Sequence, residues 1–262
     1  VIDEIEGDGI LAFFGAPTPM DDHAMQAVGC ALEMQREMES VNARNKADGL
    51  PRLEMAVAVN TGRVVVGNIG SEKRTKYGVV GSEVNFMGRI ESFAVGGEVL
   101  ISHATYEQVR DAVTVDDVIH VEMKGIPEPV KLYSVRAIAG PFNVELKEAV
   151  YEPEPIEQKI PLRLSRVDDN IVEPVPGIAW LTHLSETAAV LFTSEKVVPR
   201  EEVRIDVLDQ AFVKTLGEGF AKVVSVRDKD SGMEAVVRFT FISPGLRRLF
   251  RRAFAAGTAE KA

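Results

Sequence analysis

The sequence has a single cysteine, Cys30, among its 262 residues. One cysteine cannot form an intrachain disulfide, and it cannot supply the paired thiolates of a cysteine-based zinc site. The lack of a disulfide framework fits a reducing compartment, so we expect a cytoplasmic protein. The histidines show no metal-ligand spacing, and the single tryptophan, Trp180, is expected in a hydrophobic core.

Long hydrophobic runs and positive charge are also scarce. The longest apolar stretch, residues 10–16, is far shorter than the roughly 20 residues that a membrane-spanning helix needs. We therefore predict no transmembrane segment in this chain. The 30 Lys and Arg residues against 40 Asp and Glu residues give a net charge of −10, which argues against electrostatic binding to DNA or to an anionic membrane.

The remaining composition is that of a globular protein, because 45% of the residues are hydrophobic and 27% are charged. The length suits two domains of ordinary size. A segment rich in Pro and Glu, residues 141–158, has the composition of a linker. We therefore predict a first domain over residues 1–140, a second over residues 159–256, and a disordered tail over residues 257–262.

The first domain alternates strand and helix patterns, which predicts an α+β or α/β fold. Two short apolar runs flank an Asp-Gly turn at residues 6–9, as in a β-hairpin. Residues 24–46 then carry apolar side chains at helical spacing. Shorter helices are predicted over residues 83–92 and 103–109, strands are predicted near residues 53–60, 63–67, 99–102 and 119–135, and residues 73–76 are predicted to form a basic loop.

The second half reads as six short β-type runs separated by turn signals, which predicts a small antiparallel β-barrel. The runs lie at residues 162–166, 179–182, 189–193, 202–207, 221–227 and 234–241. Residues 243–254 then form a basic amphipathic helix, and Pro244 suits its first turn.

Three side chains in the first domain suggest phosphate or metal chemistry. Asp8 lies in a tight turn between Gly7 and Gly9, where an exposed carboxylate can bind a hard cation such as Mg²⁺. An ordinary Asp-Gly turn is the alternative. Asn85 and Arg89 are four residues apart, so on a helix they share one face and can contact ribose and phosphate oxygens. A solvated polar helix face is the alternative for this pair.

Read together, four motifs give a stronger signal than any one of them. They are IEGDGILAFFGAP (residues 5–17), NTGRVVVGNIG (residues 60–70), YGVVGSEVNFMGRIES (residues 77–92), and MKGI with VKLY (residues 123–133). Their order and spacing over residues 1–138 resemble the catalytic domain of class III adenylate and guanylate cyclases. The resemblance implies a ferredoxin-like βαββαβ fold that here lacks its first strand and first helix.

The resemblance also implies a reaction and a set of roles. Members of this family cyclise GTP or ATP in head-to-tail dimers, with two Mg²⁺ or Mn²⁺ ions held by two aspartates of one protomer. Asp8 takes the place of the second metal aspartate. In the partner protomer, Asn85 would orient the ribose and Arg89 would stabilise charge on the α-phosphate. Lys73 or Arg74, and Lys124, are the candidates for the outer phosphates.

Two further positions of the family select the purine, and here they are Glu4 and Gly78. Guanine presents N1–H and N2–H donors that a carboxylate accepts, whereas adenine presents an acceptor at N1. Glu4 therefore favours GTP over ATP, although Gly78 adds no side-chain contact. A solvated carboxylate at the end of a strand is the alternative for Glu4.

The first metal aspartate of the family would lie upstream of Val1, so Asp8 is the only family carboxylate in this chain. Because the chain opens inside a strand pattern, we expect either a fragment or a non-Met start. We expect the missing strand and helix to leave a sheet edge unpaired and apolar surface bare. We therefore predict that the chain by itself is inactive. We expect the parent protein to work as a homodimer, or this domain to form a heterodimer with an intact cyclase domain. The alternative is a non-catalytic signalling module.

The second half resembles a PilZ domain, a small barrel that binds cyclic di-GMP. The resemblance rests on HLSETAAVL (residues 183–191), on the barrel-like strands, and on VRF (residues 237–239) before the Arg-rich helix. The ligand signature of that family is degenerate here. Arg163 and Arg166 have the wrong spacing, and only Ser185 matches the expected turn. A barrel used for protein contacts is therefore favoured over a cyclic di-GMP receptor.

Overall fold

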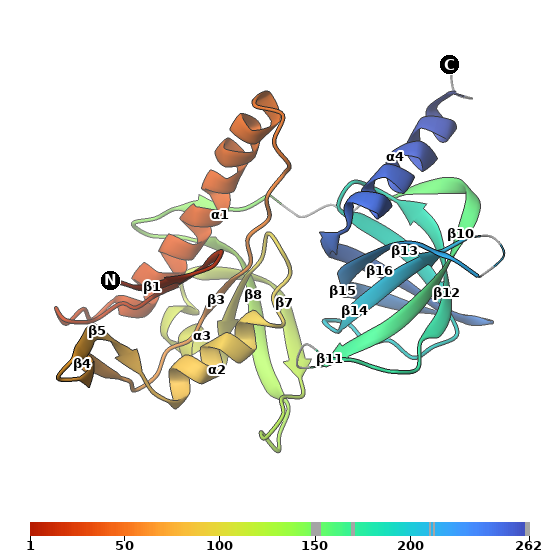
Figure 1. The fold of residues 1–262 in the computed structure, drawn as a ribbon. Helices are drawn as coiled ribbons and strands as arrows, with labels where there is room; N and C mark the ends of the chain where they lie inside the picture. Colours follow the sequence, from red (N-terminus) through yellow and green to blue (C-terminus); the bar gives the residue numbers. More distant parts are fainter. Residues whose placement is uncertain (148–152, 169–170, 210, 212, 260–262) are drawn as a thin grey trace. The chain divides into compact units, whose positions relative to one another are not determined.

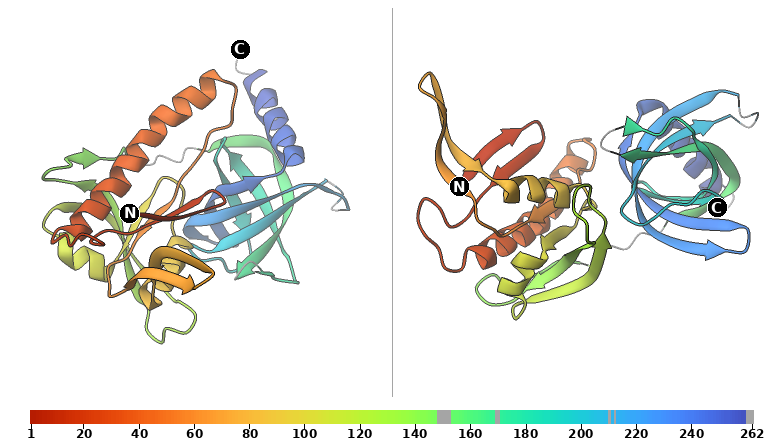
Figure 2. Two further views of the ribbon diagram at one scale, coloured as in Figure 1. Left: turned by 60° about the vertical axis from the view of Figure 1, so that its left-hand side comes forward. Right: turned by 90° about the horizontal axis from the view of Figure 1, so that it is seen from below.

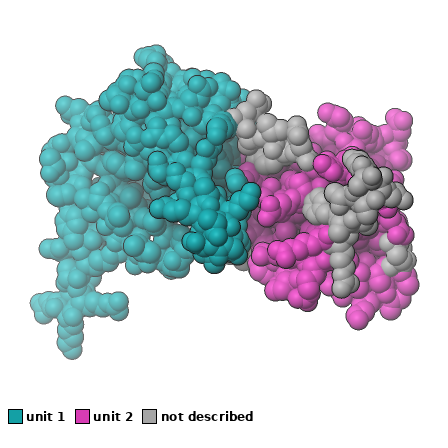
Figure 3. Space-filling model, turned by 90° about the horizontal axis from the view of Figure 1, so that it is seen from above, with its two compact units in different colours: residues 1–149 teal, residues 150–262 magenta. Residues whose placement is uncertain are grey.

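The computed structural model describes residues 1–147, 153–168, 171–209, 211 and 213–259, and for Asp168 and residues 252–259 it describes the backbone only. The chain divides into two units, residues 1–149 and 150–262 (Figure 1). Figure 3 shows the two units in separate colours. Each unit is described by itself below.

The first unit combines strands with three helices, as the alternating pattern predicted. Its strands are β1 (Ile2–Glu6), β2 (Gly9–Ala12), β3 (Val57–Val59), β4 (Val65–Ser71), β5 (Arg74–Val80), β6 (Val99–Ser102), β7 (Val113–Val121), β8 (Val130–Ile138) and β9 (Val144–Glu145). Its helices are α1 (His23–Ala47), α2 (Ser82–Glu91) and α3 (His103–Val109). The predicted helices therefore lie within one residue of their observed bounds.

The central sheet of this unit has the order β3-β6-β8-β7, and β9 pairs with the C-terminal end of β8. Successive side chains of a strand point to opposite faces, so β6 contributes to two separate cores. Val99 and Ile101 pack with α1 and α3 on one face, whereas Leu100 packs with Ile90 of α2 on the other. The sheet thus fixes α2 on the face opposite α1.

Two hairpins stand outside the central sheet. β1 pairs with β2, and β4 pairs with β5, both antiparallel. The first hairpin turns at Gly7, whose φ of +61° favours glycine, and at Asp8, which confirms the predicted Asp-Gly turn. β1 lies beside β5, as the red and brown strands show in Figures 1 and 2.

The hairpin and the central sheet both leave strand edges open, as the resemblance implied. Among the described residues, β2 pairs only with β1, and β3 pairs only with β6. Hydrophobic side chains of the first hairpin are bare: Ile2 is 64% exposed and Ile5 is 69% exposed. The expected unpaired edge and uncovered apolar surface are both present.

The second unit is a closed antiparallel barrel, which confirms the predicted architecture. Its strands are β10 (Glu154–Asp168), β11 (Ile171–Val172), β12 (Gly177–Leu184), β13 (Ala188–Thr193), β14 (Glu202–Leu208), β15 (Thr215–Lys229) and β16 (Gly232–Ile242), and α4 (Pro244–Ala259) follows. The order β10-β12-β13-β16-β15-β14 closes because β10 pairs with β14 as well as with β12. Leu246 and Phe250 of α4 are buried against the barrel core.

The predicted linker, residues 141–158, is too long at both ends. Residues 142–147 belong to the first unit: Phe142 packs into its core, and a Cβ on Gly29 of α1 would lie 2.5 Å from the Phe142 ring. Glu154 already pairs with Leu184 in the barrel. A composition rich in Pro and Glu therefore did not prevent pairing and packing, and residues 148–152 lie outside the described part of the chain.

Two smaller predictions also need correction. The predicted basic loop is mostly a strand, because Ser71 pairs with Arg74 and leaves only Glu72 and Lys73 in the turn. The predicted tail is helical over residues 257–259, where α4 continues to Ala259. Residues 260–262 of that tail lie outside the described residues.

Candidate active site

Glu4 and Gly78, the two positions that the resemblance assigns to purine selection, lie on neighbouring strands. Glu4 lies on β1 and Gly78 on β5, and Lys76 of β5 reaches across to β1. The Lys76 Nζ atom lies 3.2 Å from Glu4 Oε2 and 3.6 Å from Asp3 Oδ1. Glu4 is half exposed, whereas the buried Gly78 lies beside the Asp3 side chain. The Glu4 carboxylate is therefore open to solvent as a hydrogen-bond acceptor.

Asn85 and Arg89 both lie exposed on α2, one turn apart. The Arg89 guanidinium donates from Nη1 to the Lys124 carbonyl oxygen, at 2.9 Å. The α2 helix therefore holds Arg89 against the backbone of the loop that carries Lys124. Asn85 lies one turn before Arg89 on the same helix.

The other candidate residues lie elsewhere in the first unit. Asp8 is exposed in the turn between β1 and β2. Lys73 and Arg74 are exposed at the tip of the β4–β5 hairpin, whereas α2 starts beyond the other end of β5. Because β5 has seven residues, it separates Arg74 from α2 by about 20 Å. This chain alone does not bring these groups together with Asn85 and Arg89.

Comparison with known proteins decides the family. Residues 3–137, about half of the chain, match the model of the adenylate and guanylate cyclase catalytic domain. The chain belongs to this family. The crystal structure of the guanylyl cyclase Cya2 is 50% identical, with a TM-score of 0.54 over 56% of this chain and 75% of that chain.

Curated relatives carry the same cyclase domain within longer proteins. Adenylate cyclase 1 of Rhizobium meliloti (strain 1021) is 31% identical over 142 residues, which is 53% of this chain and 21% of that protein. The adenylate cyclase of Mycobacterium tuberculosis (strain H37Rv) is 30% identical over 122 residues, 47% of this chain and 26% of that protein. The chain thus spans about a fifth to a quarter of these relatives. In the described residues, no helix is long and apolar enough to cross a membrane.

The cyclase domain described here does not fit a two-metal centre. Asp8 is one exposed carboxylate, and the described residues contain no group of three or more His, Cys, Asp or Glu side chains that could hold a metal ion. A divalent cation of this kind needs several oxygen ligands. Cyclase domains normally use divalent metal ions, and Asp8 alone would contribute one carboxylate to such a site.

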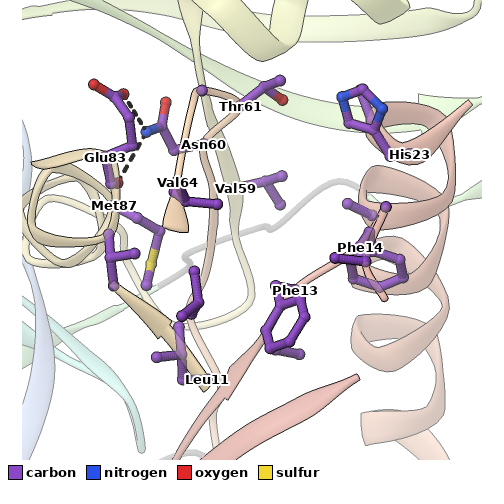
Figure 4. A pocket seen from close by; sticks show the side chains of 18 of the residues that line it. Leu11, Phe13, Phe14, His23, Val59, Asn60, Thr61, Val64, Glu83 and Met87 are labelled. Atoms are coloured by element: carbon purple, nitrogen blue, oxygen red, sulfur yellow. Dashed lines mark hydrogen bonds between the residues drawn. The ribbon is translucent and has the colours of Figure 1, made fainter. Parts of the chain in front are cut away.

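A large apolar cavity separates the two open strand edges of the cyclase domain. Its volume is about 790 Å³, and it is lined from β2 and the segment after it, from α1, and from β3. Figure 4 shows Leu11, Phe13 and Val59 directed into this space, with Met87 of α2 at one side. Asn60 Nδ2 donates to the Glu83 carbonyl and to Glu83 Oε2, both at 3.0 Å, and closes one side of the cavity.

Two polar clusters of the cyclase domain were not predicted from the sequence. Asp3 is buried beside Gly78, although nothing in its sequence neighbourhood distinguishes it from Glu4 and Glu6. The other cluster joins His103 Nδ1 to the Tyr133 hydroxyl at 2.9 Å, with Tyr106 stacked on Tyr133. Burial, together with Tyr106 and Glu107, raises the pKa of Tyr133, so its hydroxyl stays neutral and serves packing.

The three candidate ligand residues of the barrel make contacts within the barrel itself. Arg166 forms ion pairs with Glu201 and Glu173. The Ser185 hydroxyl donates to the Ala188 carbonyl at 3.1 Å and accepts from the Ala188 amide at 2.9 Å, so it stabilises its own turn. Arg163 is half-buried on β10, where its partners in the sheet are Ile178 and Asp206.

Proposed function

We propose that this chain carries a purine nucleotide cyclase domain that acts on GTP in preference to ATP, in intracellular signalling. The 3′-oxygen of the ribose attacks the α-phosphorus, the bond to the β-phosphate oxygen breaks, and the 3′-hydroxyl proton is released. The products are the 3′,5′-cyclic nucleotide and pyrophosphate. Family membership and the motif set over residues 5–133 support the reaction class.

The observation that carries the choice of GTP is the half-exposed Glu4 carboxylate on β1, next to the strand that carries Gly78. A carboxylate accepts the N1–H and N2–H groups of guanine but faces the N1 lone pair of adenine. The Lys76 ammonium lies 3.2 Å from Glu4 Oε2 and holds this carboxylate on the half-exposed side of β1. The 50% identity to the guanylyl cyclase Cya2 supports the same assignment.

The remaining roles follow from the exposed polar group on α2. Asn85 orients the ribose, and Arg89 stabilises the charge that develops on the α-phosphate. Arg89 is already held by the Lys124 carbonyl, which leaves its other N–H groups to bind phosphate oxygens. Lys124, with Lys73 or Arg74, contacts the outer phosphates.

The chain by itself is proposed to be inactive. The family places two metal aspartates on one protomer and the purine pocket, Asn and Arg on its partner, whereas this chain contributes only Asp8 to the metal side. It can therefore supply the base and ribose side of a composite site in a heterodimer with an intact cyclase domain. A homodimer of this chain would be a non-catalytic signalling module, which is the alternative function.

For the second unit, we propose a PilZ-like interaction domain that does not bind cyclic di-GMP. The self-contained contacts of Arg166 and Ser185 support this choice, because a ligand would have to replace the Glu201 ion pair and the turn hydrogen bonds. The closed barrel with its packed helix offers a rigid surface for protein contacts.

Substrate choice is testable in a composite enzyme. The chain is mixed with the catalytic domain of Cya2 in which the counterparts of Asn85 and Arg89 are replaced by alanine, so that only mixed dimers can turn over. The substitution Glu4→Lys exchanges an acceptor for a donor. We expect it to lower the ratio of kcat/KM for GTP to that for ATP by roughly tenfold or more.

Glu6→Lys is the matched control, because Glu6 is exposed on the same strand and the charge change is identical. The control is expected to leave the GTP/ATP ratio unchanged. An unaltered ratio in Glu4→Lys would contradict the assignment of the purine pocket, whatever the absolute rates of the two variants.

A further inference from the structure

A β-bulge distorts β1 at Asp3. Ile2 pairs with Ala12 and Glu4 pairs with Leu11, so two steps along β1 match a single step along β2. A bulge leaves the extra residue unpaired and redirects its side chain. Asp3 and Glu4 would otherwise point to opposite faces, yet both carboxylates approach the same Lys76 ammonium, at 3.6 Å and 3.2 Å.

The Asp3 side chain is buried, in contrast to its acidic neighbours on β1. It is 6% exposed, and its Oδ1 atom has no hydrogen-bond partner in the structure. Lys76 is the cation that compensates its charge, at a distance longer than a hydrogen bond. Burying a carboxylate with an unsatisfied oxygen destabilises a fold, so its presence here points to a role other than stability.

Asp3 also accounts for the glycine at position 78. A Cβ built on Gly78 would lie 2.5 Å from Asp3 Oδ1, which is closer than real Cβ atoms approach other atoms. The Asp3 carboxylate therefore occupies the space that a side chain at position 78 would take. A side chain at position 78 would therefore require the Asp3 carboxylate to move, although the two positions lie 75 residues apart in the sequence.

We propose that Asp3 is a positioning residue for base recognition. From beneath the pocket it fills the side-chain space of Gly78 and holds the Lys76 ammonium, and Lys76 in turn holds the Glu4 carboxylate toward the base. Asp3 itself does not touch the nucleotide. This inference rests on the proposed function, since it assumes that Glu4 reads the purine.

The test uses the composite enzyme with Asp3→Asn, which keeps the shape of the side chain and removes its charge. The expected result is a GTP/ATP ratio of kcat/KM lowered by about three- to tenfold through the KM for GTP. Lys76→Met removes the same link at an exposed position and is expected to shift the ratio equally. In the double variant the two effects should not add, because both variants break one chain of contacts.

Glu6→Gln is the control, because it removes one exposed negative charge from β1 and should leave the ratio unchanged. The outcomes distinguish a failure of the role proposed for Asp3 from a failure of the proposed function. A ratio that responds to Glu4→Lys but to neither Asp3→Asn nor Lys76→Met would overturn the role of Asp3 and leave the proposed function standing. A ratio that responds to none of them would overturn the proposed function itself. If Asp3→Asn does not fold, Lys76→Met alone decides, and an unchanged ratio in that variant overturns the role of Asp3.

Discussion

The cyclase domain and the barrel differ in how their sheets end. In the barrel, β10 pairs on both sides and closes the sheet, so every long strand has two neighbours. In the cyclase domain, β2 and β3 each have one partner among the described residues, and an apolar cavity of about 790 Å³ lies between them. Closure removes exposed edges, whereas the open edges leave backbone groups and apolar side chains without protein partners.

This difference concerns function as well as stability. The polar side chains proposed for chemistry in the cyclase domain are exposed and lie on hairpins, a helix and a loop at its surface. In the barrel, Arg166 is paired with Glu201 and Glu173, and Ser185 is hydrogen-bonded to the backbone of its own turn. On the proposed function, the open unit keeps groups available for a substrate and a second protomer, and the closed unit does not.

The largest expected effect is on core packing. Leu191 of β13 is fully buried, so Leu191→Ala should lower the free energy of unfolding of the barrel by about 2–5 kcal/mol. The matched change Leu11→Ala, in the wall of the cavity, should cost less than about 1 kcal/mol, because Leu11 already lies beside empty space. Urea denaturation measures both, and fluorescence of the single Trp180 on β12 reports the barrel alone.

Equal losses of unfolding free energy in the two leucine variants would contradict the contrast between the barrel core and the cavity wall. That result would mean that the cavity wall packs as tightly as the barrel core. A circular-dichroism transition recorded beside the fluorescence would show which unit has lost stability, because the longest helix, α1 (25 residues), belongs to the cyclase domain and the barrel contributes α4 (16 residues).

The smallest expected effect concerns ligand binding by the barrel. Calorimetric titration of the whole chain with cyclic di-GMP should give no binding heat, because Arg166 and Ser185 are already occupied. The variant Glu201→Gln weakens the ion pair of Arg166 and serves as the companion measurement. Micromolar binding by the unmodified chain would contradict the interaction-domain proposal and would make the two units alike in carrying a ligand site.

Local patterns predicted the helices of the first unit and most strands of both units, but not strands such as β5 and β9. Apolar spacing located α1 within one residue, and the Asp-Gly signal located the β1–β2 turn. Strand-like runs with turn signals predicted the barrel, because each run depends on its own residues and on its nearest neighbours. The motif set predicted the cyclase family, which the family match over residues 3–137 confirms, whereas the roles of Asn85, Arg89 and Lys124 stay predictions.

Features that depend on pairing between distant segments were not predictable. The bulge at Asp3 exists only in the register of β1 with β2, and the burial of Asp3 depends on Gly78 of another hairpin. Composition likewise misjudged residues 142–147, because Phe142 and Val144 find partners on α1 and β8. The ends of the predicted linker were wrong for this reason.

The most direct test of the central claim is the rate of cyclic GMP formation by the composite enzyme. The unmodified chain alone is expected to give no product from GTP with Mn²⁺, and the Cya2 domain without its Asn and Arg is expected to give none either. Their mixture should form cyclic GMP, and Arg89→Ala in this chain should lower that rate by roughly a hundredfold or more. A mixture that stays inactive, or whose activity is indifferent to Arg89→Ala, would contradict the claim that this chain supplies the base and ribose side of a cyclase site.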